Sequence, residues 1–312
     1  MESKYKKKIL FIGMPDMAII CLARLISDGF NIIGVVPPHP GEPTYDFMVQ
    51  FAKKSGLNVL TYEKSINDPD FINKVKILNA DLAVVCSYNK KFSPALLSSV
   101  KGGFVNVHPS LLPKYRGANP YSHVILNDEK ETGVTLHLMD ENFDTGNIIW
   151  QKKVPVAPND TMGTIFNKLN FVSAEMLSDF LKQAEHTPFI KSVPQPIGEY
   201  EKAFVIDNKN MKNYIDWSKD AAYIERFVRA LNPFITAMTT FRGIFMKIYS
   251  AQVINKKVKE EPGTIISAKD NIAVATGDGV LCIKSLQFGS YMITDSKAFI
   301  QMFSPKQGEK LI

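Results

Sequence analysis

The chain has 312 residues, of which 45% are hydrophobic and 22% are charged, so it can bury a sizeable core and is neither a disordered nor a fibrous protein. Its length favours two domains over one. The three cysteines, Cys21, Cys86 and Cys282, are too far apart for a disulfide framework or a zinc site, so we expect core cysteines and a reducing setting without a structural metal.

The first apolar stretch, residues 9–22, follows several lysines and superficially resembles a secretory signal. Pro15 and Asp16 interrupt it, and no small-residue cleavage site follows, so we expect no export. No later apolar run reaches the roughly 20 residues that a membrane-spanning helix needs. These patterns together predict a cytoplasmic protein without a membrane partner.

The first 180 residues alternate short apolar runs with stretches of helical periodicity. Strands are predicted at residues 8–12, 31–36, 58–60, 81–86, 104–108, 132–139 and 147–154. Helices are predicted at residues 16–27, 45–54, 69–78, 119–127 and 160–180. Buried strands alternating with helices are typical of a doubly wound, Rossmann-like α/β domain with a mostly parallel sheet. The first turn, residues 13–18, lacks the GxGxxG pattern, so no dinucleotide site is expected there.

The carboxyl-terminal third has a different pattern. Residues 188–211 lose periodicity and contain three prolines, which predicts a linker between a catalytic domain at 1–187 and a second domain at 212–312. Ser218 is expected to cap a helix that ends near Asn232. Short β-prone runs follow, near residues 236–241, 244–254, 262–266, 271–276 and 279–286. Five short strands favour a small OB-like β-barrel.

Residues 206–312 carry most of the net positive charge of the chain. They hold 15 Lys and Arg against 10 Asp and Glu, a difference of +5 out of +6 for the whole chain. A basic barrel could follow a phosphate backbone. A solvated surface is an equally good interpretation of so modest an excess.

Residues 104–146 hold the densest set of polar side chains set against apolar strand. Polar and apolar residues alternate in 104–108, so Asn106 and His108 would share one face of a strand that Pro109 ends. The amide and the imidazole would emerge at the carboxyl end of that strand, where ligands bind in open α/β sheets. Together with Asp144 from the following acidic loop, they predict an active site.

Asn106, His108 and Asp144 suit one kind of chemistry. The amide can donate to an oxygen that becomes negative, the imidazole can take up or return a proton, and the carboxylate can orient the ring. Without a serine or cysteine nucleophile beside them, they suit direct transfer of an acyl group between two nitrogens. Each also has a purely structural interpretation, as a satisfied histidine, an amide bonded to backbone or a turn aspartate. Six neighbours are interpreted as surface charges or as histidines with no evident partner: Lys114, Arg116, Asp140, Glu141, His123 and His137.

The run NVHPSLLPKYRG, followed by ETGVTLHLMDENFDTGNII, resembles the folate-dependent formyltransferases. The opening FIGMPDMA and the later runs IDWSKDAAYIERFVRALNP and VATGDGVLCIKSLQ are similar to members of the same family, so the resemblance covers most of the chain. It implies an enzyme that transfers a formyl group from 10-formyltetrahydrofolate to a primary amine without a metal.

The resemblance also implies roles for single residues. Asn106 would hold the formyl oxygen as it becomes an oxyanion, His108 would manage the proton, and Asp144 would orient His108 and an ordered water. The tetrahydrofolate-binding stretch of the family falls on four consecutive residues, Ser110, Leu111, Leu112 and Pro113. The strand end at 85–88 and the loop 139–143 would line the pterin pocket.

Two acceptor amines fit the resemblance. The carboxyl-terminal runs and the basic excess favour methionyl initiator tRNA, which we expect as the partner. The family members that act on this tRNA carry a Lys- and Arg-rich insertion after the second strand, whereas this chain has only residues 37–43 there. That short loop resembles the members that formylate nucleotide-linked amino sugars. A catalytically idle RNA-binding relative and a hydrolase of 10-formyltetrahydrofolate are further alternatives, although the first is disfavoured by the intact catalytic set.

Overall fold

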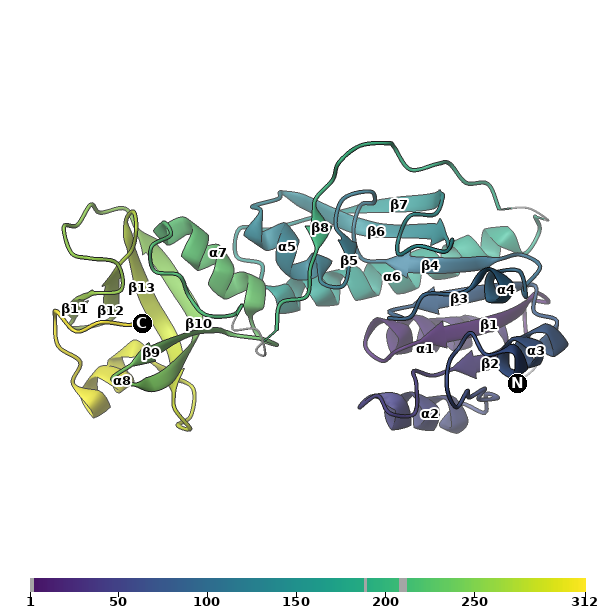
Figure 1. The fold of residues 1–312 in the computed structure, drawn as a ribbon, viewed down its shortest axis with the longest axis horizontal. Coiled ribbons are helices and arrows are strands. Elements are labelled where there is room, and N and C mark those ends of the chain that lie inside the picture. Colours follow the sequence, from purple (N-terminus) through teal and green to yellow (C-terminus); the bar gives the residue numbers. More distant parts are fainter. Residues whose placement is uncertain (1–2, 188–189, 208–211) are drawn as a thin grey trace. The chain divides into compact units, whose positions relative to one another are not determined.

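A computed structural model describes residues 3–187, 190–207 and 212–312 (Figure 1). The chain divides into two compact units, each with its own sheet. Unit 1 comprises Met1–Pro120, Glu131–Pro155 and Asn167–Ala203, and unit 2 comprises Tyr121–Lys130, Val156–Phe166 and Phe204–Ile312. Within the described residues, no helix is both long enough and apolar enough to span a bilayer.

Unit 1 contains a six-stranded sheet in the order β2-β1-β3-β4-β6-β7. Its strands are β1 (Lys8–Gly13), β2 (Asn31–Val36), β3 (Leu82–Cys86), β4 (Phe104–His108), β6 (Glu131–Leu138) and β7 (Ile148–Pro155). The first four run parallel to one another, whereas β6 runs antiparallel to both β4 and β7. The predicted Rossmann-like, mostly parallel sheet is confirmed.

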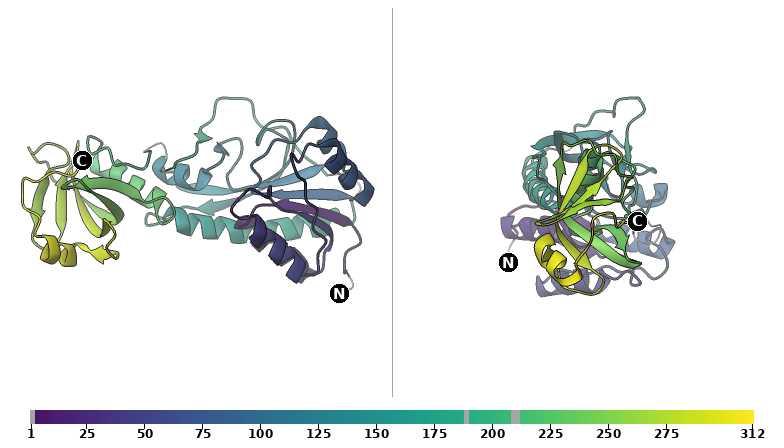
Figure 2. Two further views of the ribbon diagram at one scale, coloured as in Figure 1. Left: turned by 60° about the horizontal axis from the view of Figure 1, so that its bottom comes forward. Right: turned by 90° about the vertical axis from the view of Figure 1, so that its left-hand side faces the viewer.

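Helices cover both faces of this sheet (Figures 1 and 2). The helices of the first 184 residues are α1 (Met17–Asp28), α2 (Tyr45–Lys54), α3 (Pro69–Leu78), α4 (Pro94–Leu97), α5 (Pro120–Leu126) and α6 (Met162–Ala184). On one face, Leu10 and Phe104 belong to the same buried cluster as Phe71 of α3. Phe11 and Val84 point to the opposite face and are also fully buried. Burial on both faces explains why these strands are continuous apolar runs.

Residues 190–203, which we call the strap, pair with earlier segments of unit 1. Val193 and Ile148 exchange two backbone hydrogen bonds of 2.8 Å. Further along, β8 (Lys202–Ala203) pairs in parallel with β5 (Arg116–Gly117), as Figure 1 shows. The strap lies within the predicted linker, 188–211, of which residues 188–189 and 208–211 lie outside the described residues.

Unit 2 is built on an antiparallel sheet in the order β11-β12-β13-β10-β9, with β14 beside β13. The elements are α7 (Ala221–Leu231), β9 (Ala237–Phe241), β10 (Ile244–Ile254), β11 (Ile265–Ala268), β12 (Ile272–Ala275), β13 (Val280–Phe288), β14 (Thr294–Asp295) and α8 (Ser296–Phe303). The predicted cap of α7 is wrong. Asp220, not Ser218, is the N-cap, because its carboxylate accepts a 2.7 Å bond from Tyr223 N while the Ser218 hydroxyl bonds to Asp216.

The last residues join the two ends of this strand order. Thr240 of β9 and Ile312 exchange backbone bonds of 2.7 and 3.0 Å. Leu311 N donates to Gly263 O, next to β11, at 2.8 Å, and Ile265 N donates to Glu309 O at 2.8 Å. Because β9 and β11 lie at opposite ends of the order, these bonds close the sheet into the small barrel predicted from the sequence.

This closure predicts that Leu311→Ala destabilises unit 2. Leu311 is 3% exposed in the barrel core, so its truncation should lower the free energy of unfolding by about 2 to 5 kcal/mol. The measurement is chemical denaturation of a Trp150→Phe background, in which Trp217, the other of the two tryptophans, reports on unit 2 alone.

The matched control is the next residue, Ile312→Ala. The side chain of Ile312 is 78% exposed, so its truncation removes little buried apolar area, and the alanine keeps the same backbone hydrogen bonds. The free energy of unfolding should therefore change by less than about 0.5 kcal/mol. Equal effects of the two substitutions would contradict a role of the last residues in the barrel core.

Candidate active site

Asn106 and His108 both reach the carboxylate of Asp144. Asn106 Nδ2 and His108 Nδ1 each lie 3.4 Å from Asp144 Oδ1. Alternate residues of a strand point to the same side of a sheet, so β4 presents the amide and the imidazole to a single oxygen. The structure therefore brings together the three residues that the sequence predicts as one cluster.

Asp144 lies in the loop between β6 and β7, with a φ of 59° in the left-handed region. Its side chain is 11% exposed, and its Oδ2 accepts a 3.0 Å bond from Gly117 N. Burial raises the pKa of this carboxyl, but the nearby His108 and His137 and the Gly117 N–H outweigh it, so the net pKa lies well below its usual range. Asp144 is thus a carboxylate anion held in a largely buried place.

His108 is buried and its Nε2 lies 3.0 Å from Tyr115 O. Because a carbonyl oxygen only accepts, Nε2 carries the proton and donates it, and Nδ1 faces Asp144 with its lone pair. Burial lowers the pKa of His108, with Asp144 acting in the opposite direction. A second proton on Nδ1 would point at the Asp144 carboxylate, so the ring can take up and return a proton at this atom.

His137 was not predicted as a member of the site, and the expectation that it has no partner is wrong. It lies opposite Asn106 in the register of β4 and β6 and is 1% exposed. Its Nδ1 donates to Leu138 O at 2.8 Å, so its Nε2 accepts from Asn106 Nδ2 at 3.0 Å. Through the His137 ring, the Leu138 carbonyl determines which way the Asn106 amide points.

The expectation for His123 is also wrong, because its Nε2 lies 3.0 Å from Phe204 O and 3.1 Å from Phe204 N. Arg116 is not a free surface charge either, since its Nε donates to Gln195 Oε1 at 3.1 Å. Asp140 shapes its own loop by accepting bonds from Asn142 N and the Thr145 hydroxyl at 2.9 and 2.6 Å.

The stretch from Ser110 to Pro113 is held against the sheet. The buried Ser110 hydroxyl donates to Lys114 O at 2.7 Å. Leu112 N donates to Thr135 Oγ1 at 3.1 Å, and Leu112 O accepts from Gln151 Nε2 at 2.8 Å. The Ser110 hydroxyl and the Leu112 backbone are therefore bonded within the protein, whereas Leu111 and Pro113 remain partly exposed.

The two segments predicted to flank a ligand pocket approach each other through their loops. Lys91 follows Tyr88 by three residues. Its Nζ lies 3.5 Å from Asn142 Oδ1 and 5.6 Å from the centroid of the Phe143 ring. Phe143 is 47% exposed, and the Tyr88 hydroxyl lies 2.6 Å from that of Tyr62. An exposed aromatic ring thus stands in the same loop as Asp144.

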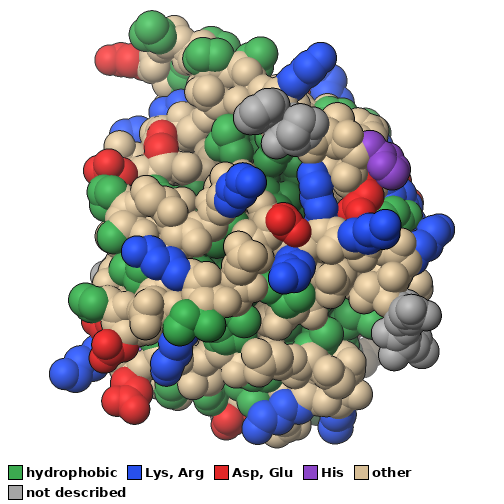
Figure 3. Space-filling model, turned by 90° about the vertical axis from the view of Figure 1, so that its right-hand side faces the viewer, with side chains coloured by type: hydrophobic (Ala, Val, Ile, Leu, Met, Phe, Trp, Pro, Cys, Tyr) green, Lys and Arg blue, Asp and Glu red, His purple; other side chains and the backbone are tan. Residues whose placement is uncertain are grey.

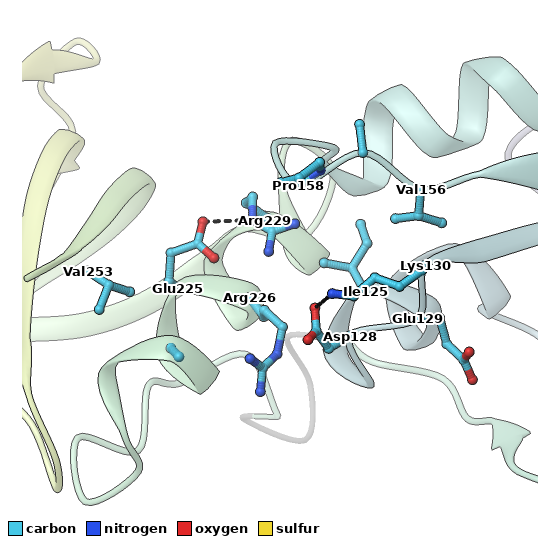
Figure 4. A pocket seen from close by; sticks show the side chains of 12 residues that line it. Ile125, Asp128, Glu129, Lys130, Val156, Pro158, Glu225, Arg226, Arg229 and Val253 are labelled. Carbon is cyan, nitrogen blue, oxygen red and sulfur yellow. Dashed lines mark hydrogen bonds and ion pairs between the residues drawn. The ribbon is translucent and has the colours of Figure 1, made fainter. Parts of the chain in front are cut away.

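Unit 2 has a hollow of its own, drawn in Figure 4, that contains charges of both signs. Arg229 pairs with Glu225 at 2.7 Å, and Lys130 pairs with Asp128 at 2.7 Å. On the face drawn in Figure 3, Lys and Arg side chains are likewise spread among Asp, Glu and apolar side chains. Neither view shows a uniformly basic surface.

Among the described residues, no group of three or more His, Cys, Asp or Glu side chains is placed to hold a metal ion. Cys21, Cys86 and Cys282 are unpaired and buried, as predicted for core cysteines.

Comparisons with known proteins point to one family. Residues 29–181 match the formyl transferase domain, and residues 209–304 match the formyl transferase C-terminal domain. The chain is 37% identical over 288 residues to methionyl-tRNA formyltransferase of Clostridioides difficile, covering 90% of this chain and 92% of that protein. It is 33% identical to the protein of the same name from Acetivibrio thermocellus, covering 97% and 99%.

The chain belongs to the formyl transferase family. Solved structures with the same fold include an N-formyltransferase from Helicobacter canadensis in complex with folinic acid and dTDP-3-aminofucose, with a TM-score of 0.64, 20% identity and coverage of 89% of this chain and 98% of that one. HypX from Aquifex aeolicus aligns with a TM-score of 0.63 and 17% identity, over 97% of this chain and 49% of that one. The family resemblance found in the sequence is confirmed.

The environment of His108 makes a prediction about the pH dependence of stability. Because the pKa of the buried ring is lowered on folding, the unfolded chain binds more protons at mildly acidic pH, and the free energy of unfolding falls as the pH falls below about 6.5. His108→Gln removes this contribution. The stability of the wild type relative to the variant should therefore decrease between about pH 8 and pH 5 in urea denaturation.

His186→Gln, which changes an exposed histidine of unit 1, is the control and should unfold with the pH dependence of the wild type. If the curves of wild type and His108→Gln run parallel over the whole range, the ring does not have the lowered pKa that its burial indicates.

Proposed function

We propose that this formyltransferase transfers a formyl group from 10-formyltetrahydrofolate to the amino group of methionyl initiator tRNA, in translation initiation in the cytoplasm. The observation that carries the proposal is the cluster in which Asn106 and His108 meet the buried Asp144 carboxylate. The cluster supplies the chemistry. The acceptor is inferred from relatives named for it that are 33% to 37% identical and cover at least 90% of the chain.

Asn106 is the proposed donor to the formyl oxygen. One of its two amide hydrogens is held by His137 at 3.0 Å, while the other makes a longer contact of 3.4 Å with Asp144. The longer bond is the weaker one and is the one that a substrate oxygen can replace. The amide would then stabilise the negative charge that develops on that oxygen in the tetrahedral intermediate.

His108 and Asp144 are the proposed pair for the proton. The amine must lose a proton as it attacks, and His108 Nδ1 has a free lone pair next to Asp144 Oδ1. Once protonated, the ring would lie beside a carboxylate that is already ionised, which favours the imidazolium form. Asp144 would also hold an ordered water in line with the transfer.

The described residues fit a folate. When bound, it supplies the formyl group. We assign its contacts to the stretch of Ser110, Leu111, Leu112 and Pro113, in which the partly exposed Leu111 and Pro113 would offer apolar surface while the Ser110 and Leu112 bonds keep the stretch in place. The exposed ring of Phe143 would cover the pterin or benzoyl ring from the Asp144 loop.

One observation favours a smaller acceptor, a nucleotide-linked amino sugar. The loop after β2 is short and folded back: His39 Nε2 donates to Glu63 O at 2.8 Å, and Gly41 N donates to His39 Nδ1 at 3.1 Å. Glu42 adds a negative charge, 3.7 Å from Lys90. A loop held in this way offers few free cations to a tRNA backbone, so we keep the nucleotide-linked amino sugar as the second candidate acceptor.

If Asn106 is the oxyanion donor, Asn106→Ala should lower kcat by about 100- to 1,000-fold and leave folate affinity largely unchanged. The measurement is steady-state formyl transfer together with calorimetric titration of tetrahydrofolate. Asn58→Ala, which removes an exposed amide in unit 1, is the matched control and should retain wild-type turnover. Near-normal turnover of Asn106→Ala would contradict the assignment of Asn106 as the oxyanion donor.

The acceptor is tested by formyl transfer from 10-formyltetrahydrofolate to methionyl initiator tRNA and, in parallel, to nucleotide-linked 3-amino and 4-amino sugars. We expect transfer to the tRNA, with an apparent affinity that falls steeply with added salt because lysines and arginines would release counterions from the phosphates. Transfer to a sugar alone, or tRNA binding that does not respond to salt, would replace the first candidate by the second.

A further inference from the structure

Gln195 in the strap contacts the active-site loop through both ends of its amide. Its Nε2 donates to Asp144 O and to Gly146 O, both at 2.8 Å. Its Oε1 accepts from Arg116 Nε at 3.1 Å and from a second nitrogen of the same guanidinium. One partly buried side chain therefore links the loop that carries Asp144 to β5.

These bonds act on both ends of the Asp144 residue. The Asp144 carboxylate is held by Gly117 N at 3.0 Å, and Gly117 directly follows Arg116. Gln195 thus hydrogen-bonds to the backbone of Asp144 and also to β5, the strand whose Gly117 N–H orients the Asp144 side chain. The loop needs such anchors, because Asp144 has a φ of 59°, a conformation that few non-glycine residues adopt.

The loop is also built to pass close to the sheet. A Cβ at Gly146 would come within 1.8 Å of Leu138 O, so only glycine fits there. The close approach puts the Gly146 carbonyl where Gln195 can reach it together with the carbonyl of Asp144.

The strap is itself anchored on either side of Gln195. Two residues before it, Val193 exchanges both backbone bonds with Ile148. After it, Tyr115 N donates to Glu201 O at 2.6 Å, and β8 pairs with β5. Pro194 and Pro196 flank Gln195 and restrict the backbone between the anchors. The Gln195 amide is therefore held by a segment whose backbone is restrained on both sides.

We propose that Gln195 is a positioning residue that keeps Asp144 in register with His108 and Asn106. It touches neither of these two side chains and acts through the Asp144 backbone and β5. The inference rests on the proposed function, because it gives Gln195 a role in the reaction only through Asp144.

A consequence for His108 follows from the groups that face its ring. These are Asp144 from the loop after β6, His137 on β6, Arg116 on β5 and the carbonyl of Tyr115. Of the charged side chains, Asp144 alone raises the pKa of His108. If Asp144 moves away, the pKa of His108 should fall further below its usual value.

The test uses the full chain with two substitutions, Gln195→Ala and Gln195→Glu. The glutamate keeps the size of the side chain and an acceptor for Arg116 but lacks both donated bonds, so it separates the two halves of the contact and guards against misfolding of the alanine variant. We expect kcat to fall by about 10- to 100-fold in both variants, with little change in the KM for the folate. In nuclear magnetic resonance titrations, with the ring assigned by comparison with His108→Gln, the pKa of His108 should be lower in Gln195→Ala. Gln195→Glu is compared by kcat alone, because its carboxylate adds a negative charge beside Arg116 that would itself raise the pKa of the ring.

Ile197→Ala is the matched control in the same segment, since the side chain of Ile197 is fully exposed, and it should behave as the wild type. In an Asp144→Asn background, Gln195→Ala should cost no further activity, because the residue through which it acts has already been removed. An undiminished loss of kcat in that background would overturn the inference, since Gln195 would then act by another route.

The titrations need no substrate, so the two proposals can fail separately. If the wild type transfers formyl groups while both Gln195 variants keep its kcat and Gln195→Ala keeps its His108 pKa, the role of Gln195 is overturned and the function stands. If the wild type formylates no acceptor while the pKa of His108 falls in Gln195→Ala, the proposed function fails and the positioning of Asp144 by Gln195 stands.

Discussion

A buried negative charge on Asp144 is the constraint on which the site depends. With 11% of its side chain exposed, the carboxylate would be several kcal/mol less stable there than in water without partners. It obtains them from one side-chain amide and one backbone N–H, contributed by Asn106 at 3.4 Å and Gly117 at 3.0 Å. These two residues come from β4 and β5, so satisfying the charge requires the sheet and the loops to be in their native arrangement.

The sequence predicts best those features that depend on neighbours along the chain. The helices at Tyr45–Lys54 and Pro69–Leu78 have the predicted bounds, since their apolar spacing and the proline at Pro69 are local signals. The pairing of Asn106 with His137 was missed because it depends on β6 lying antiparallel beside β4, which periodicity does not encode. The cap of α7 was placed wrongly because Ser218 and Asp220 both suit that role and only the fold selects between them.

The strap was interpreted as a linker for the same kind of reason. Prolines and the loss of periodicity describe a segment without regular structure of its own, but they do not indicate what it contacts. In the sequence, Gln195 is one polar residue between two prolines, and no local pattern indicates that its amide donates to the carbonyls of Asp144 and Gly146. Residues in irregular segments are therefore those for which structure adds most to the sequence.

The orientation of the side chains in the proposed catalytic cluster is determined mainly by backbone groups. The carbonyl of Tyr115 orients His108, and the carbonyl of Leu138 orients Asn106 through the ring of His137. Backbone groups in and beside strands have little freedom, so the side chains they hold lose little entropy when a substrate binds. The proposed direct transfer between two nitrogens requires such preorganisation, because without a covalent intermediate the amide and the imidazole would have to act on one tetrahedral centre together. A sheet that delivers its donors and acceptors at fixed positions meets that requirement.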